Sequence, residues 1–130
     1  MDDREPHTAG QVFAPKNEAS LAAILTETFA QTQVRESSHY STGRYVRVDF
    51  PSDVEFFFER ISDDEYLIRG EGEDQQSLGN AAHEIATCFG QHGLRCRFET
   101  YDSGDSLVGY SHNEWPLPEK PGSKTLDAKT

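Results

Sequence analysis

The chain has 130 residues, of which 23 are acidic and 12 basic, and it carries a net charge of −11 at pH 7. This length fits one domain that can bury a core without metals, and two cysteines are too few for a disulfide framework. The negative charge argues against binding of nucleic acid or anionic membranes and favours a basic partner protein. Neither a signal peptide nor an apolar run of membrane-spanning length is visible, which predicts a cytoplasmic protein.

Both ends of the chain are rich in proline, glycine and charge. Residues 1–16 and 116–130 contain few apolar side chains, so burial cannot offset the entropy that ordering them would cost. They are therefore predicted to be flexible segments on either side of a single domain over residues 17–115. Trp115, at the end of that domain, is expected to cap the edge of the core, with an exposed anchor as the alternative.

The first half of the predicted domain is one helix followed by three strands. Asn17 stands at an N-cap position, and the apolar residues after it recur with helical spacing, which predicts a helix over about residues 18–33. The apolar stripe of this helix comprises Leu21, Ile24, Leu25, Thr28 and Phe29. Residues 35–43 are predicted to be a loop. Alternating apolar and polar residues then predict a meander of three short strands at 44–50, 54–59 and 66–70.

The second half is a helix followed by a hairpin. Asp74 or Ser77 is a candidate cap for a helix that ends near Gly90, and two alternating strands follow at 94–99 and 107–112. The predicted order is α-β-β-β-α-β-β, an α+β fold in which two helices pack on one face of a five-stranded antiparallel sheet. The other face of this sheet is expected to be solvated and charged, or to bind a partner.

Acidic residues concentrate on the predicted meander, where the chain has ten carboxylates and only two arginines between Asp49 and Asp74. Phenylalanine occupies three consecutive positions, 56–58, so at least one ring must lie on the face of the sheet away from the helices. Alternation assigns that place to Phe57, next to Tyr45. The predicted partner-binding residues are Tyr45, Asp49, Glu55, Phe57, Glu59, Asp63, Asp64, Glu65, Glu71, Glu73 and Asp74.

Candidate catalytic and metal motifs have simpler explanations. Cys88, His92 and Cys96 are spaced like metal ligands, but both cysteines fall on predicted core faces, where free cysteine behaves as a small apolar residue. His83 begins a motif like that of zinc proteases, but Thr87 occupies the position that needs a second histidine. No catalytic residue, cofactor or metal site is therefore predicted.

The predicted element order in a small acidic chain resembles that of the class I type III secretion chaperones. The resemblance implies a non-enzymatic protein that binds an extended segment of a secreted effector as a dimer. Small acidic immunity proteins, which plug the active site of a basic toxin, are similar in size and charge. We therefore expect an acidic protein-binding module that neutralises or inhibits a basic partner protein.

Three alternatives remain open. The first is a secretion-chaperone-like protein that binds an effector. The second is a small hydrolase or small-molecule-binding protein with a pocket between the second helix and the sheet, using His83, His92 or a carboxylate. The third is a purely structural homo-oligomer, such as a homodimer, that buries Phe57 and Tyr45 across a symmetry axis. A concave pocket with two converging titratable groups would favour the enzyme, and a convex acidic sheet face would favour the binding module.

Overall fold

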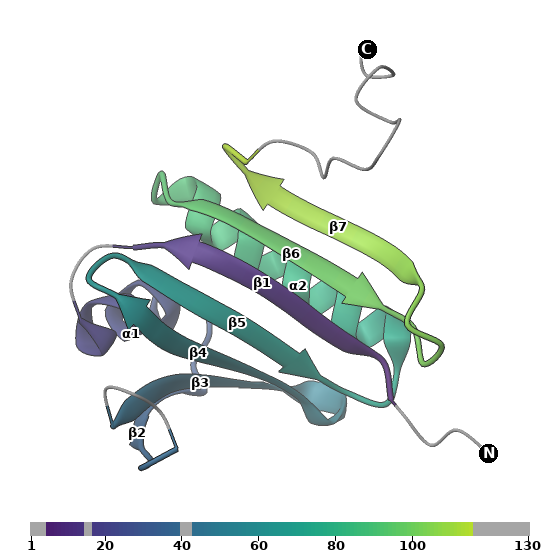
Figure 1. The fold of residues 1–130 in the computed structure, drawn as a ribbon, viewed down its shortest axis with the longest axis horizontal. Helices are drawn as coiled ribbons and strands as arrows, with labels where there is room; N and C mark the ends of the chain where they lie inside the picture. Colours follow the sequence, from purple (N-terminus) through teal and green to yellow (C-terminus); the bar gives the residue numbers. More distant parts are fainter. Residues whose placement is uncertain (1–4, 15–16, 40–42, 116–130) are drawn as a thin grey trace.

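The computed structural model describes residues 5–14, 17–39 and 43–115 (Figure 1). The strands are β1 His7–Phe13, β2 Thr32–Glu36, β3 Arg44–Phe50, β4 Val54–Ser62, β5 Glu65–Glu71, β6 Arg95–Tyr101 and β7 Leu107–Asn113. The helices are α1 Glu18–Thr26 and α2 Gln75–Gln91, and a short 3₁₀ turn, η1 Pro51–Asp53, joins β3 to β4. The strands form one antiparallel sheet in the order β2-β3-β4-β5-β1-β6-β7. The tail predicted for residues 116–130 lies outside the described residues.

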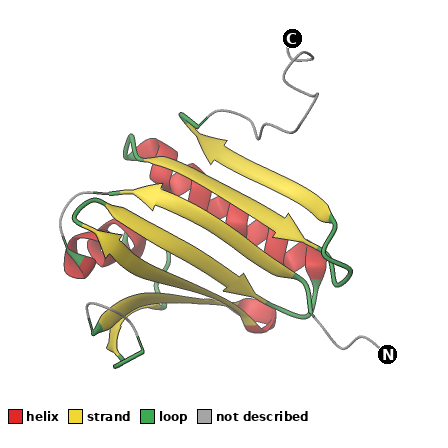
Figure 2. Cartoon of the chain, viewed as in Figure 1, coloured by secondary structure: helices red, strands yellow, loops and turns green. Residues whose placement is uncertain are grey.

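Both helices pack on the same face of the sheet (Figure 2). The carboxylate of Asp74 caps α2 by accepting a hydrogen bond from the backbone N–H of Ser77. The fully buried side chains between the helices and the sheet include Val12, Leu21, Leu25, Val46, Phe56, Phe58, Tyr66, Leu78, Ile85, Phe89 and Phe98. Neither of the helices that the structure describes is long and apolar enough to cross a membrane.

The prediction of a five-stranded sheet is wrong, because β1 and β2 are two further strands. β1 lies within the segment 1–16, for which the sequence predicts flexibility, and it pairs with both β5 and β6 in the middle of the sheet. Its buried positions are Thr8, Gly10 and Val12, and of these only valine is strongly apolar. β1 is therefore held by pairing with two strands that are distant in sequence, and its own hydrophobic pattern is weak.

The first helix is shorter than predicted, because α1 ends at Thr26. Phe29 remains in the core, at 7% exposure, and its backbone N–H donates to the carbonyl of Leu25 at 2.8 Å. The chain then turns: the hydroxyl of Thr32 donates to the carbonyl of Phe29 at 2.6 Å, and Thr32 pairs with Val48 in β3. Pairing at the edge of the sheet thus overrides the helical spacing that the sequence shows here.

The two additional strands change the element order. The described chain runs β-α-β-β-β-β-α-β-β, whereas the sequence predicts α-β-β-β-α-β-β. The α+β class is confirmed. The resemblance to the secretion chaperones rests on the predicted order, so it does not describe the topology of this chain.

Both cysteines lie in the core, as the sequence predicts, with Cys88 at 2% exposure and Cys96 at 0%. Burial raises the pKa of Cys96 to about 12 and also raises the pKa of Cys88. Because the thiolate is the nucleophile, we expect neither cysteine of the folded chain to react with an aromatic disulfide reagent at neutral pH, and both to react in denaturant. Rapid release of the chromophore before unfolding would contradict this burial.

Candidate protein-binding face

The face of the sheet that points away from α1 and α2 has no described helix or strand over it (Figure 2). The strand register arranges its side chains in rows across the sheet. From β2 to β7 the middle row consists of Gln33, Arg47, Phe57, Arg69, Ala9, Glu99 and Tyr110. We call the surface built on this row and its neighbouring rows the open face.

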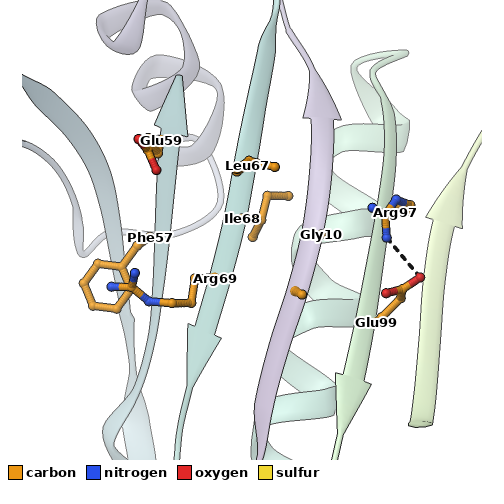
Figure 3. Close-up of a pocket in the computed structure, with 9 residues that line it drawn as sticks. Gly10, Phe57, Glu59, Leu67, Ile68, Arg69, Arg97 and Glu99 are labelled. Carbon is orange, nitrogen blue, oxygen red and sulfur yellow. Dashed lines mark ion pairs between the residues drawn. The ribbon is translucent and has the colours of Figure 1, made fainter. Parts of the chain in front are cut away.

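Phe57 is the centre of an aromatic and cationic cluster on the open face. The centroid of its ring lies 6.0 Å from that of Tyr45. The guanidinium carbons of Arg47 and Arg69 lie 5.5 Å and 4.7 Å from the same ring centroid. Figure 3 shows the Arg69 side chain laid across the Phe57 ring. The structure thus places Phe57 and Tyr45 together, on the face to which alternation assigns them.

The open face carries both positively and negatively charged side chains, which form ion pairs with one another. Arg47 Nε donates to an Asp49 carboxylate oxygen at 2.9 Å, and Arg47 Nη2 lies 3.1 Å from Glu55 Oε2. Arg69 Nε lies 3.1 Å from Glu71 Oε2. The hydrogen bond to Asp49 raises the pKa of Arg47. Three of the predicted partner-binding carboxylates are therefore already compensated by arginines of the same chain.

A shallow pocket of about 320 Å³ lies in the open face (Figure 3). It forms because the small Ala9 of β1 stands between the longer side chains of Arg69 and Glu99 in the same row. Phe57 and Leu67 supply apolar surface to its lining, and Leu67 is 42% exposed. The pocket is therefore a place where a partner can bury an apolar group in the middle of a charged surface.

The charges in this pocket are compensated except at one position. Arg97 Nη1 lies 2.9 Å from Glu99 Oε2, and Arg97 also donates to the side-chain oxygen of Gln11 at 2.7 and 3.0 Å. Within the described ranges, no hydrogen bond or ion pair joins the half-buried Glu59 to another residue. Glu59 thus places one uncompensated negative charge beside the apolar lining.

One end of the sheet gathers carboxylates from four separate segments. There η1, the β5–α2 connection, the β6–β7 hairpin and the start of β1 come together (Figure 1). The register places Glu55, Glu71, His7 and Tyr101 in one row at this end. We call its carboxylates the acidic end: Glu5, Asp49, Asp53, Glu55, Glu71, Glu73, Asp74, Asp102 and Asp105. Such a concentration of one sign creates a negative field at the surface.

Eight of the eleven predicted partner-binding residues lie at the two ends of the sheet. Five of them belong to the acidic end: Asp49, Glu55, Glu71, Glu73 and Asp74. Three lie around the β4–β5 turn at the opposite end: Asp63, Asp64 and Glu65. Glu65 accepts a hydrogen bond from Gln11. The sequence alone does not predict Glu5, Asp102 and Asp105 as part of this cluster, because only the sheet register brings them to the other acids.

Trp115 does not cap the core, contrary to the first of its two predicted roles. The centroid of its ring lies 5.6 Å from that of Phe13, and the guanidinium carbon of Arg95 lies 4.7 Å from the centroid of the Trp115 ring. Phe13 and Arg95 pair with each other across β1 and β6, in line with the open-face residues Gln11 and Arg97. Trp115 and Phe13 therefore form a second aromatic cluster on the open face, at the end opposite the acidic end.

A groove of about 340 Å³ lies between α2 and β7, where the sequence analysis allows an enzyme pocket. His83 Nδ1 lies 3.4 Å from Ser111 Oγ, and His112 also lines the groove. His92 does not line this groove, and its Nε2 lies 3.2 Å from Glu27 Oε1 instead. The described lining contains no carboxylate that could orient His83 as a catalytic base. In residues 5–14, 17–39 and 43–115, no group of three or more histidine, cysteine or acidic side chains could hold a metal ion.

Comparison of the chain with protein-family models, with curated proteins and with solved structures gives no significant match.

Proposed function

We propose that this chain is a non-enzymatic, acidic protein-binding module of the cytoplasm that binds a basic partner protein on its open face and neutralises or inhibits it. The observation that carries the proposal is the pocket beside Phe57, in which apolar lining adjoins the uncompensated carboxylate of Glu59. Aromatic rings at a protein surface, such as the half-buried ring of Phe57, are typical of the sites that anchor protein partners.

A lysine or arginine side chain of the partner matches this pocket. Its aliphatic stem would pack on Phe57 and Leu67 while its cationic head reaches Glu59. Both arginines that line the pocket are already paired with carboxylates, so the charge left over is negative. The pocket therefore favours a cationic side chain over an anionic one.

The acidic end has a different part in the proposal, because it acts at a distance. Its carboxylates produce a field that attracts a basic protein before contact and raises the association rate. Arg47 and Arg69 pair with some of these groups, but the turns contribute exposed acids such as Asp53 and Glu73 that have no arginine beside them in the sequence. Steering of this kind weakens as salt is added, since screening shortens the range of the field.

The first test is capture of the partner on the tagged full chain at low salt, followed by elution with a salt gradient. We expect a basic protein to be released in a stoichiometric amount as the salt concentration rises. Addition of the purified chain should then reduce the activity of that protein. Capture of nothing, or of a partner that salt does not release, would contradict the proposal.

Glu59→Gln should weaken binding of the captured partner about tenfold, mainly through faster dissociation, because it removes the charge that holds a cationic side chain in the pocket. Glu73→Gln is the matched control, since it makes the same charge change at the acidic end. It should slow association modestly at low salt and leave dissociation unchanged. Surface plasmon resonance at two salt concentrations separates the two rates. Equal effects of both variants on the dissociation rate would contradict the assignment of Glu59 as the residue that holds the cationic side chain of the partner.

A further inference from the structure

β7 is an edge strand whose pairing with β6 is interrupted by one register shift, at Val108, and neither charge nor proline protects its edge. Leu107–Asn113 contains no aspartate, glutamate, lysine, arginine or proline. Leu107 and Val108 are 42% and 45% exposed. Natural edge strands are usually short, charged or interrupted by proline, because their free backbone N–H and C=O groups can pair with another strand. β7 therefore has the properties of an edge strand that pairs with a further strand.

The opposite edge of the sheet provides the contrast. β2 is two residues shorter than β7, with five residues against seven, and it ends in Arg35 and Glu36. Both of these charged residues are exposed, as is Val34 beside them at 38%. β2 therefore carries the length and the charges that discourage a further strand, and β7 carries neither.

The groove of about 340 Å³ between α2 and β7 adjoins this strand on the helix side of the sheet. On the helix side it is lined by His83, Ala86, Thr87 and Gly90 of α2, and on the sheet side by Tyr110 to Asn113 of β7. An exposed sheet edge is the place where proteins accept an additional strand. An added strand would therefore find free backbone groups along the edge of β7.

We infer that a second copy of this chain pairs with this edge, so that the two β7 strands lie antiparallel and the two sheets become continuous. Antiparallel pairing of a strand with its own copy satisfies twofold symmetry, and it continues the antiparallel order of the sheet. The described groove lining has no carboxylate to hold a basic peptide. Two copies that each carry −11 repel each other, and they come together with least repulsion at an uncharged strand.

This dimer is independent of the proposed function, since the β7 edge leaves the open face accessible. The two associations also respond to salt with opposite sign. Binding of a basic partner weakens as salt rises, whereas pairing of two acidic copies strengthens, because salt screens their mutual repulsion. Asp105 and Glu114, which flank β7, contribute to that repulsion.

Sedimentation velocity of the full chain over a range of concentrations tests the inference. We expect a species of twice the 14.6 kDa monomer mass, whose fraction rises with protein and with salt concentration. Val108→Glu should weaken this dimer at least about tenfold, because it adds a carboxylate to the uncharged strand at which two negatively charged copies meet. Val34→Glu is the matched control on the other edge of the sheet, and it should leave the dimer intact.

Hydrogen exchange provides a second measurement that needs no variant. Amides of β7 that face the free edge should exchange slowly at high protein concentration and rapidly on dilution, while those of β2 should not change. A chain that stays monomeric at every concentration would overturn the inference. So would a dimer that is lost on Phe57→Ala but kept on Val108→Glu, because that result places the contact on the open face.

Discussion

Gly10→Ala should lower the free energy of unfolding by about 3 kcal/mol, near the upper end of the usual cost of overpacking. A Cβ atom at Gly10 would lie 2.2 Å from the backbone oxygen of Arg97 and 3.2 Å from the Cα of Phe98, both in β6. These are backbone atoms of a neighbouring strand, so they cannot rotate away as a side chain can. β1 and β6 would have to separate at the position where they pair. Urea titration followed by circular dichroism measures the loss.

Gly79→Ala is the control, because a Cβ atom at Gly79 meets nothing within 4 Å. Gly79 lies inside α2, where alanine is favoured over glycine by about 0.5 to 1 kcal/mol, so this variant should be more stable than the parent chain. The same substitution is thus expected to have opposite signs at two positions. A Gly10→Ala variant as stable as the parent would show that β1 does not lie against β6 in this register.

The parts of the fold that the sequence predicts are those in which a strand carries its own pattern. β4 shows this best, since Val54, Phe56 and Phe58 recur at every second position and are buried, with Glu55 and Glu59 among the residues between and after them. β1 alternates as well, but with Thr8 and Gly10 at inward positions, so its hydrophobic signal is weak. Its place in the sheet is decided by pairing with β5 and β6, which are distant in sequence. These pairings produce no pattern in the sequence of β1 itself from which they could be predicted.

The same distinction applies to the candidate site. The outward position of Phe57 follows from three consecutive phenylalanines, and that of Glu59 follows from alternation two residues later. The pocket between them and Arg97 exists only because Ala9 of β1 lies in between, and a prediction that leaves β1 outside the domain cannot contain this pocket. The division of the predicted acids between two ends of the sheet likewise depends on strand length and register. A count of charged residues along the sequence gives neither of these.

Arg60→Ala should lower the free energy of unfolding by about 3 kcal/mol, because it removes the arginine that faces a buried carboxylate. Glu18, at the start of α1, is 1% exposed, and its Oε2 lies 3.4 Å from Arg60 Nε. Burial, with a further contribution from the charge of Glu18, raises the pKa of the neighbouring Tyr66 to about 12. The surroundings of the carboxylate are therefore poorly solvated, so water cannot easily replace the arginine.

A double-mutant cycle separates this ion pair from simple packing. Glu18→Gln removes the negative charge and keeps the shape of the side chain, and it should cost about 1 kcal/mol, the usual value of a hydrogen bond. In that background Arg60→Ala should cost much less than in the parent chain, because no buried charge remains to be compensated. Chemical unfolding of the four chains measures the coupling. An equal cost in both backgrounds would mean that Arg60 stabilises the fold through contacts of its aliphatic stem, and that the buried charge is satisfied by other groups.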